Sequence, residues 1–300
     1  MTRKILLFGK DGQVGSELLP CLQDVGTVVA MGRLECDMSD DAQIASAVHA
    51  VRPDVIINAT AYTAVDKAEQ QVLQAELINA RAVGTLARAA RDSAALLIHY
   101  STDYVYAGDK SAPYVESDAT GPRSVYGRSK LAGEDLIREY CPAHFIFRTS
   151  WVFGLNGDNF LKTILGLIQQ RDSLGVVADQ HGTPTSADLI ARTTREIVGK
   201  YLEPASFNPE RFGTYHLVAD GVTTWHGYAR LIAQLAQEMG LATKIKPDSI
   251  ASLSTQQYPL PAPRPANSRL DTSKLKWAFG LELPRWEDDV RRVLEQLLQR

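Results

Sequence analysis

The chain has 300 residues, of which 45% are hydrophobic and 22% charged, and its 32 Lys and Arg against 35 Asp and Glu give a formal net charge of −3. This composition is typical of a folded globular protein and excludes a disordered, collagen-like or low-complexity chain. A nucleic-acid-binding protein usually carries a basic excess or a basic run, and neither is present here. The length suffices for two domains.

The cysteines and the apolar segments indicate a cellular compartment. Cys21, Cys36 and Cys141 are odd in number and lack the spacing of a zinc site, so we expect reduced thiols. The apolar run that follows Met1 is too short for a signal peptide, and no stretch of about 18 apolar residues is found. We therefore expect a cytoplasmic protein without a membrane segment.

Short, continuously apolar runs alternate with helical segments such as Leu77–Ala90 in the first half of the chain. The runs are Ile5–Phe8, Val28–Met31, Val55–Ile57, Leu96–Tyr100 and Phe145–Phe147. Continuous hydrophobicity predicts strands that helices cover on both faces. The pattern thus predicts an α/β fold with a Rossmann-type, doubly wound parallel sheet, whose ligands bind at the carboxyl ends of the strands.

The regular alternation of apolar runs and helical segments ends at about Arg148. Helical spacing predicts helices over 159–170, 188–200, 227–239 and 286–298, and strands over 176–178 and 214–218. We expect a loop over 201–212, and the prolines of 258–265 exclude helix and central strand there. We interpret residues 1–150, with return segments at about 183–220, as one domain. Residues 151–182 and 221–300 would form a smaller C-terminal lobe over its ligand cleft.

A glycine-rich loop directly follows the first predicted strand. Gly9, Gly12 and Gly15 precede a helix predicted over 16–23. Such glycines allow a tight turn and a close approach of the backbone to a pyrophosphate, and the helix N-terminus offers free N–H groups to phosphates. Any turn from strand to helix can use glycine, so placement at the start of the fold carries the interpretation. We predict that residues 1–150 bind NAD(P).

The end of the second predicted strand bears on the choice between NAD and NADP. An NAD site normally has an acidic residue there, whereas this chain has Gly32 and Arg33. A guanidinium favours the 2′-phosphate of NADP, so we expect NADPH to be preferred over NADH. The alternative is a solvated surface arginine, and the nearby Glu35 leaves the choice open. Asp37 and Met38 follow in the sequence. We expect the Asp37 carboxylate to contact the amino edge of adenine and the Met38 thioether to contact its ring face.

Tyr126 and Lys130 are four residues apart at the start of a predicted helix, so they share one helical face. A tyrosine is a proton donor at neutral pH, and a nearby ammonium stabilises the tyrosinate, lowering its pKa by about three units or about 4 kcal/mol. Thr102 follows the strand that ends at Tyr100 and is placed to donate to a substrate carbonyl. This set suits carbonyl reduction. The alternatives are an ordinary helix pair and a turn residue.

These motifs are similar to those of the dTDP-4-dehydrorhamnose reductase family, a branch of the extended short-chain dehydrogenases/reductases. The matching stretches cover almost the whole chain. They are Leu6–Gly15, Ala61–Glu69, His99–Val105, Tyr126–Glu134, Phe147–Gly154 and Arg264–Leu270.

The resemblance implies a reaction: hydride from NAD(P)H reduces the 4-keto group of dTDP-4-dehydro-β-L-rhamnose to dTDP-L-rhamnose, the last step in making that sugar nucleotide. Thr102, Tyr126 and Lys130 would form the catalytic set, with Tyr126 as proton donor. The expected cofactor-binding residues are Gly9, Gly12, Gln13, Val14, Gly15, Arg33, Asp37, Met38, Ala61, Tyr62, Thr63, Tyr100, Tyr126 and Lys130. The expected substrate-binding residues are Thr102, Asp103, Trp151, Asn159 and Arg269.

The resemblance also implies partners. These are a dTDP-sugar substrate and, as one option, a second copy in a homodimer, while neither nucleic acid nor membrane is expected. Some relatives use Mg²⁺ at a dimer contact, for which acidic residues of the later lobe are candidates, although carboxylates on helix surfaces are normally solvated. The candidates are Asp188, Glu287, Asp288 and Glu295.

Other functions stay open at this point. One alternative is another nucleotide-sugar 4-ketoreductase or an epimerase, and another is a non-catalytic NADP-binding regulatory subunit. A 4,6-dehydratase is disfavoured because Tyr104 follows Asp103 where related dehydratases have glutamate. Trp151 has an alternative role in packing between the lobes, and Arg269 in a surface ion pair.

Overall fold

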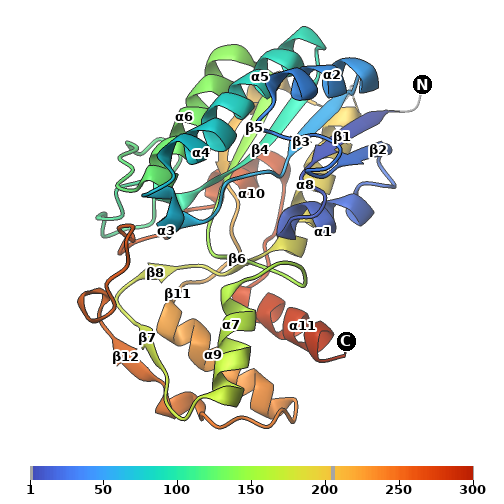
Figure 1. The fold of residues 1–300 in the computed structure, drawn as a ribbon. Helices are drawn as coiled ribbons and strands as arrows, with labels where there is room; N and C mark the ends of the chain where they lie inside the picture. The colour runs from blue at the N-terminus through green and yellow to red at the C-terminus, as the bar shows by residue number, and fades with distance from the viewer. Residues whose placement is uncertain (1–2, 204–206, 300) are drawn as a thin grey trace.

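The computed structural model describes residues 3–203 and 207–299. Its centre is a sheet of six strands in the order β10-β5-β4-β3-β1-β2, in which every neighbouring pair is parallel (Figure 1). The strands are β1 (Lys4–Phe8), β2 (Thr27–Met31), β3 (Val55–Asn58), β4 (Leu96–Thr102), β5 (His144–Thr149) and β10 (Gly213–His216). The predicted doubly wound parallel sheet is confirmed, and the strand order reverses at β1, where ligands of such sheets bind.

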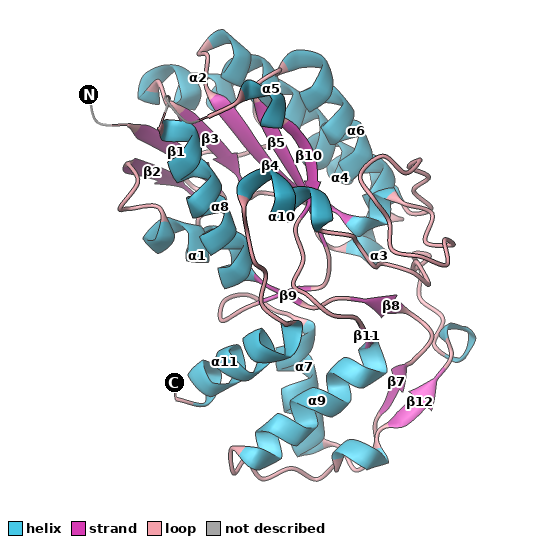
Figure 2. Cartoon of the chain, turned by 180° about the vertical axis from the view of Figure 1, so that it is seen from behind, coloured by secondary structure: helices cyan, strands magenta, loops and turns pink. Residues whose placement is uncertain are grey.

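Helices cover both faces of this sheet (Figure 2). Those on one face are α1 (Gln13–Cys21) and α8 (Ala187–Leu202). Those on the other are α2 (Asp41–Val51), α5 (Ala82–Asp92) and α6 (Val125–Tyr140). The two short helices α3 (Val65–Ala68) and α4 (Val72–Glu76) follow β3.

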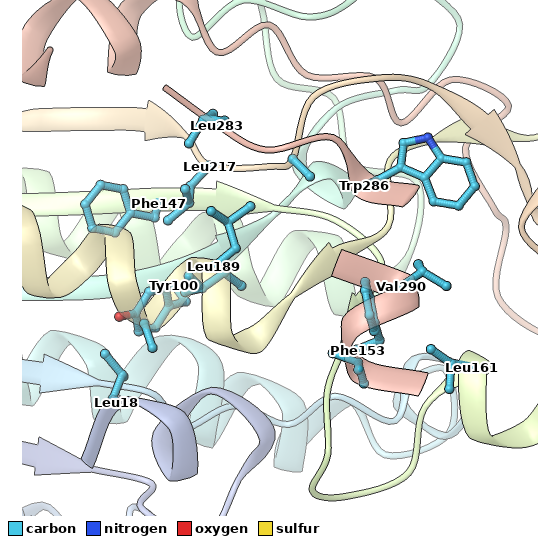
Figure 3. Packing of buried hydrophobic residues seen from close by; sticks show 14 of the residues in the cluster. Leu18, Tyr100, Phe147, Phe153, Leu161, Leu189, Leu217, Leu283, Trp286 and Val290 are labelled. Carbon is cyan, nitrogen blue, oxygen red and sulfur yellow. The ribbon is translucent and has the colours of Figure 1, made fainter. Parts of the chain in front are cut away.

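The buried strands explain the continuous apolar runs of the sequence. In β1, Ile5 and Leu7 belong to the core under α1 and α8, whereas Leu6 and Phe8 belong to the core under α2, α5 and α6. Successive side chains of a strand point to opposite faces, so both sets must be apolar. The first of these cores is drawn in Figure 3, where it continues from the sheet into the rest of the molecule.

A smaller lobe lies beyond the carboxyl ends of the strands (Figure 1). Its helices are α7 (Phe160–Gln170), α9 (Trp225–Glu238) and α11 (Trp286–Leu298), while α10 (Ser273–Phe279) contacts β10. Its paired short strands are β6 (Val152–Phe153) with β9 (Thr185–Ser186), β7 (Gly175–Val177) with β12 (Ala251–Leu253), and β8 (His181–Gly182) with β11 (Thr223–Thr224). The later elements α8 and β10 return to the sheet. The domain boundaries given above remain a prediction.

One predicted helix has a different shape. The segment predicted as a helix over 77–90 begins with a π-helical turn, η1 (Leu77–Arg81), and only then continues as α5. The wider turn carries the buried Asn79, whose side chain bonds the backbone of Tyr62 and the hydroxyl of Ser129. π-turns often occur at functional sites, and this one fixes the loop after β3. Periodicity in the sequence does not reveal it.

The remaining predicted elements agree with the structure to within a few residues. The helix predicted over 16–23 is α1, which begins earlier, at Gln13. The loop predicted over 201–212 contains the end of α8 and a 3₁₀ turn at Pro209–Arg211, and residues 204–206 lie outside the described residues. Within the described ranges, no helix is both long and apolar enough to cross a membrane.

Candidate active site

A cleft of about 1010 Å³ lies at the carboxyl ends of β1, β2 and β3. Seven of the predicted cofactor-binding residues line it, and they come from the three successive loops that follow these strands. They are Gly9, Gly12, Arg33, Asp37, Met38, Ala61 and Tyr62. The volume lies at the upper end of the range for small-molecule and cofactor sites.

Two positions of the first loop must be glycine because a side chain there would clash with the backbone. Gly9 has a φ of +87°, and a Cβ there would lie 2.8 Å from the carbonyl carbon of Ala59. A Cβ on Gly15 would lie 1.9 Å from the Gly9 carbonyl oxygen. The N-cap of α1 is Gly12, and no side chain of the described residues caps that end of the helix. The first-turn N–H groups therefore stay available to an anion, and the residues present fit a dinucleotide pyrophosphate.

The loop after β2 presents an exposed arginine to the cleft. The side chain of Arg33 is 85% exposed, and its Nε lies 4.0 Å from Asp37 Oδ2. Glu35, the acid that left the cofactor choice open, forms an ion pair with Lys10 and accepts from the Gly32 N–H at 2.8 Å. Hydrogen bonds from Ser39 lower the pKa of Asp37, so this carboxylate is ionised at neutral pH. Arg33 is therefore the basic group that faces the cleft here.

The other predicted cofactor residues lie outside the cleft lining. Gln13 Oε1 accepts from Asn159 Nδ2 at 3.1 Å, and Val14 packs against the core under α1. The Thr63 carbonyl accepts from the Val65 N–H at 2.9 Å. Tyr100 is buried, with its hydroxyl 2.8 Å from Thr194 Oγ1. Gly15 serves the shape of the loop, as described above.

Tyr126 lies in the first turn of α6, whose N-cap Ser124 accepts from the Gly127 N–H at 3.0 Å. Its ring meets the ring of Tyr104 edge-on, with centroids 5.6 Å apart. Tyr62, which lines the cleft, packs against the same small cluster of buried residues as Tyr126. Burial raises the pKa of Tyr126 to about 12, although a hydrogen bond with Thr102 acts in the opposite direction. The phenol is therefore fully protonated at neutral pH, as a proton donor requires.

Lys130 lies one turn further along α6, and its side chain is buried against β4. Its Nζ donates to the Tyr100 carbonyl oxygen at 2.6 Å and lies 3.0 Å from His99 Nε2. Burial lowers the pKa of Lys130 to about 8. The sequence led us to expect a lowered pKa for Tyr126, but the net shift is upward. The reason is that burial penalises both charged forms, the tyrosinate and the ammonium.

Thr102 and Asp103 form the turn at the end of β4. The Thr102 hydroxyl donates to Asp103 Oδ1 at 3.0 Å and accepts from the Tyr104 N–H at 3.2 Å. Burial raises the pKa of Asp103 to about 6, which hydrogen bonds to its carboxylate partly oppose. Thr102, Asp103 and Tyr126 are thus brought together.

A second cavity, of about 460 Å³, lies in the smaller lobe next to Tyr104. Its apolar lining comes from α7, β7 and the proline-rich segment, with Trp225 and Arg264 at its wall. Arg264 pairs with Asp66 through Nη2 (2.7 Å), and its Nη1 is buried without a hydrogen-bond partner among the described residues. Trp225 and Arg264 were not predicted as site residues from the sequence, and Tyr104 served only to disfavour a dehydratase. Tyr104 and Arg264 do lie within the matching stretches His99–Val105 and Arg264–Leu270.

All five predicted substrate residues lie outside the lining of this cavity, and Thr102 and Asp103 are described above. The ring of Trp151 stacks on Trp225, with centroids 3.7 Å apart, and its φ is +49°. Asn159 caps α7 by accepting from the Lys162 N–H, and it bonds Gln13. Arg269 donates to Asn267 Oδ1 and to the Ser111 carbonyl. Two of these other three residues touch the cavity wall: Trp151 stacks on Trp225, and the Asn159 carbonyl accepts from the Thr163 hydroxyl at 3.0 Å.

The acidic residues considered for Mg²⁺ are dispersed. Asp188 pairs with Arg192 and Arg292, and Glu287 pairs with Arg285. Within residues 3–203 and 207–299, no group of three or more His, Cys, Asp or Glu side chains is arranged to hold a metal ion.

Comparisons with known proteins cover almost the full chain. The family model described as RmlD substrate binding domain matches residues 3–299. The dTDP-4-dehydrorhamnose reductase of Salmonella typhimurium is 46% identical over 297 residues, which are 98% of this chain and 97% of that protein. The crystal structure of a dTDP-4-dehydrorhamnose reductase from Clostridium acetobutylicum matches with a TM-score of 0.90 at 32% identity, covering 99% of this chain and 100% of that one. The Bacillus anthracis reductase in complex with NADP matches with a TM-score of 0.89 at 30% identity, covering 99% and 100%.

Proposed function

The chain belongs to the RmlD family of dTDP-4-dehydrorhamnose reductases, and from this premise we propose how its residues divide the work of the reaction. The protein is an oxidoreductase that reduces the 4-keto group of dTDP-4-dehydro-β-L-rhamnose to dTDP-L-rhamnose with NAD(P)H. The nicotinamide cofactor supplies the hydride when bound. The protein must bind both molecules and supply a proton to O4. It must also stabilise the negative charge that is left on the proton donor.

Tyr126 donates that proton. The observation that carries this assignment is its position: the ring contacts Tyr104 at the wall of the second cavity, and it shares a packing cluster with Tyr62 at the wall of the first. A donor at this place reaches a substrate that extends from one cavity to the other. Thr102, at the end of β4 beside Tyr126, orients the keto oxygen. Lys130 in its ammonium form stabilises the tyrosinate that is left.

The cofactor is held by the first cleft. The N–H groups at the start of α1 and the glycine loop bind the pyrophosphate. Asp37 and Met38 contact the adenine, and Arg33 binds the 2′-phosphate, so NADPH is preferred over NADH. Glu35 does not compete for the ribose hydroxyl because Lys10 and the Gly32 N–H already engage its carboxylate.

The nucleotide part of the substrate occupies the second cavity. The buried Nη1 of Arg264 has a donor to offer to a diphosphate oxygen, and the stacked pair Trp151 and Trp225 offers a flat apolar wall to a base. Arg264 takes this role in place of Arg269, whose guanidinium is engaged by Asn267 and Ser111. A cytoplasmic location and a homodimer remain predictions from the sequence.

The experiment is an assay of cofactor consumption. The purified protein is mixed with NADPH and a 4-keto dTDP-sugar, and the loss of dihydronicotinamide absorbance is compared with the product formed. Equal amounts support the reductase. Turnover with unchanged absorbance indicates an epimerase, and NADPH binding without any turnover indicates a regulatory subunit.

A further inference from the structure

A buried row of polar side chains runs from the cofactor cleft to Lys130. It consists of Thr60, which lines the cleft, then Asn58, His99 and Lys130, and the last three are each at most 1% exposed. Asn58 ends β3 and is the parallel-register partner of His99 in β4, so the sheet itself sets these two side chains against each other. The Asn58 Nδ2 lies 3.1 Å from His99 Nδ1, and His99 Nε2 lies 3.0 Å from Lys130 Nζ.

The protons of this row can be assigned from one fixed donor. The Thr60 backbone N–H can only donate, and it donates to Asn58 Oδ1 at 3.0 Å. The Thr60 hydroxyl bonds the same oxygen. The amide group of Asn58 therefore turns its NH₂ toward His99, and an amide NH₂ can only donate. It follows that His99 Nδ1 accepts and carries no proton.

The protonation of His99 determines which form of Lys130 fits beside it. A neutral imidazole with an unprotonated Nδ1 carries its proton on Nε2, which faces Lys130 Nζ. This N–H needs an acceptor, and the only acceptor that lysine offers is the lone pair of its uncharged amine. An ammonium would instead set two donors against each other at 3.0 Å. One proton on Lys130 still reaches the Tyr100 carbonyl at 2.6 Å.

We propose that His99 is a positioning residue for the reduction: its Nε2–H donates to the amine of Lys130, and the tautomer imposed by Asn58 and Thr60 thereby opposes the ammonium form of that lysine. His99 acts through Lys130 and contacts neither substrate nor cofactor in this assignment. The inference rests on the proposed role of Lys130. Because the row begins at Thr60 in the cleft wall, it also connects the cofactor cavity with the protonation state of Lys130.

The charged groups around Lys130 do not cancel the effect of His99 on its protonation. Glu134, the next residue on the same face of α6, favours the ammonium. Its carboxylate, however, receives two bonds from Arg148, at 2.9 and 2.6 Å, and one from Arg138 at 3.1 Å. From β4, the groups that face Lys130 are His99 and the Tyr100 carbonyl, and Tyr126 lies on its own helix. Burial of Lys130 acts in the same direction as the His99 tautomer, toward the neutral amine.

The first test is independent of activity. In the full chain with ¹⁵N-labelled histidine, long-range ¹H–¹⁵N correlation spectra distinguish protonated from unprotonated ring nitrogens. The chain has six histidines, and the His99 signals are identified by their loss in His99→Gln. We expect Nε2 to be protonated and Nδ1 unprotonated at neutral pH. A proton on Nδ1, in either the other tautomer or the imidazolium, overturns the proposal even if the reductase activity stands.

The second test uses the pH profile. Lys130 must be an ammonium to stabilise tyrosinate, so kcat falls as the pH rises through its pKa. His99→Leu removes the opposing donor, and Asn58→Asp gives His99 Nδ1 an acceptor, which turns Nε2 into an acceptor for the ammonium. Both changes should move the alkaline midpoint of kcat upward by about one pH unit.

The matched control is His144→Leu, because His144 is a buried histidine of the neighbouring strand β5 that bonds the Cys141 carbonyl. It should lower stability without moving the alkaline midpoint. If His99→Leu and Asn58→Asp change stability or kcat and leave the midpoint where the wild type has it, His99 has only a structural role. If neither variant folds, the tautomer spectrum of the wild type still decides.

Discussion

The two cavities of this protein are built in different ways. The lining of the cofactor cleft lies entirely between residues 8 and 78: it comes from the three consecutive loops at the ends of β1, β2 and β3 and from α4 and η1, which follow directly. The second cavity is lined by segments that are far apart in the chain, from Tyr104 through α7 and Trp225 to Arg264. A site made of consecutive strand ends leaves a motif with regular spacing. A site assembled from distant segments depends on how the lobes pack, and its residues share no spacing.

The sharpest test of the cofactor cleft is Gly15→Ala. A Cβ at this position would lie 1.9 Å from the Gly9 carbonyl oxygen, so the loop has to move. We expect the Kd for NADPH to rise by roughly 100-fold or more, because several phosphate contacts are displaced together. Fluorescence titration of NADPH measures this.

Gly166→Ala is its control, since a Cβ on that glycine of α7 would lie within 4 Å of no atom in the described part of the chain beyond its own helix. This variant should bind NADPH normally and gain roughly 0.5–1 kcal/mol in free energy of unfolding. Normal NADPH binding by Gly15→Ala would refute the role of this loop.

A test of the second cavity is Arg264→Met. Loss of the guanidinium should raise the KM for the dTDP-sugar by about 10- to 100-fold, the usual range for a charge-assisted hydrogen bond. The Kd for NADPH should not change, because the two cavities are separate. Steady-state kinetics at saturating NADPH give the KM.

Asp66→Asn is the matched variant for Arg264. It breaks the ion pair of 2.7 Å with Arg264 but keeps the guanidinium in the protein. We expect a clearly smaller rise in KM than for Arg264→Met. Equal effects of the two variants would mean that the ion pair only holds the proline-rich segment in place.

A smaller effect, confined to one cofactor, is expected for Arg33→Ala. Its side chain is 85% exposed, so solvent weakens any pairing with a 2′-phosphate. We expect kcat/KM for NADPH to fall about tenfold, with kcat/KM for NADH unchanged. The exposed Arg91 of α5 provides a neutral control as Arg91→Ala. Parallel losses with both cofactors would show that Arg33 does not read the 2′-phosphate.

The difference between the cavities also explains how much the sequence could predict. The parallel sheet and the glycine loop follow from local patterns, as the alternation of Ile5 and Leu6 between two cores illustrates. Asn79 was missed because it lies in a π-helical turn, which has no simple periodicity. Arg269 was expected to bind the substrate, and the contacts of its guanidinium with Asn267 and the Ser111 carbonyl depend on how distant segments pack, which the sequence does not reveal.

The partners of Lys130 could not be predicted for a related reason. Its i, i+4 spacing from Tyr126 is visible in the sequence, but its contact with His99 depends on how α6 packs against β4. The contact of His99 with Asn58 depends in turn on the register of β3 against β4. Spacing along one helix identified the pair of residues, whereas the shifts of their pKa values come from burial, which only the folded structure supplies.

The central claim is that the phenol of Tyr126 is the proton donor for the reduction, and Tyr126→Phe tests it directly. The variant keeps the ring, which packs against Tyr104, and removes only the hydroxyl. Single-turnover measurements with bound NADPH should show hydride transfer slowed by roughly 100- to 10,000-fold, while the Kd for NADPH stays within about twofold of the wild type. Hydride transfer at the wild-type rate in this variant would contradict the account.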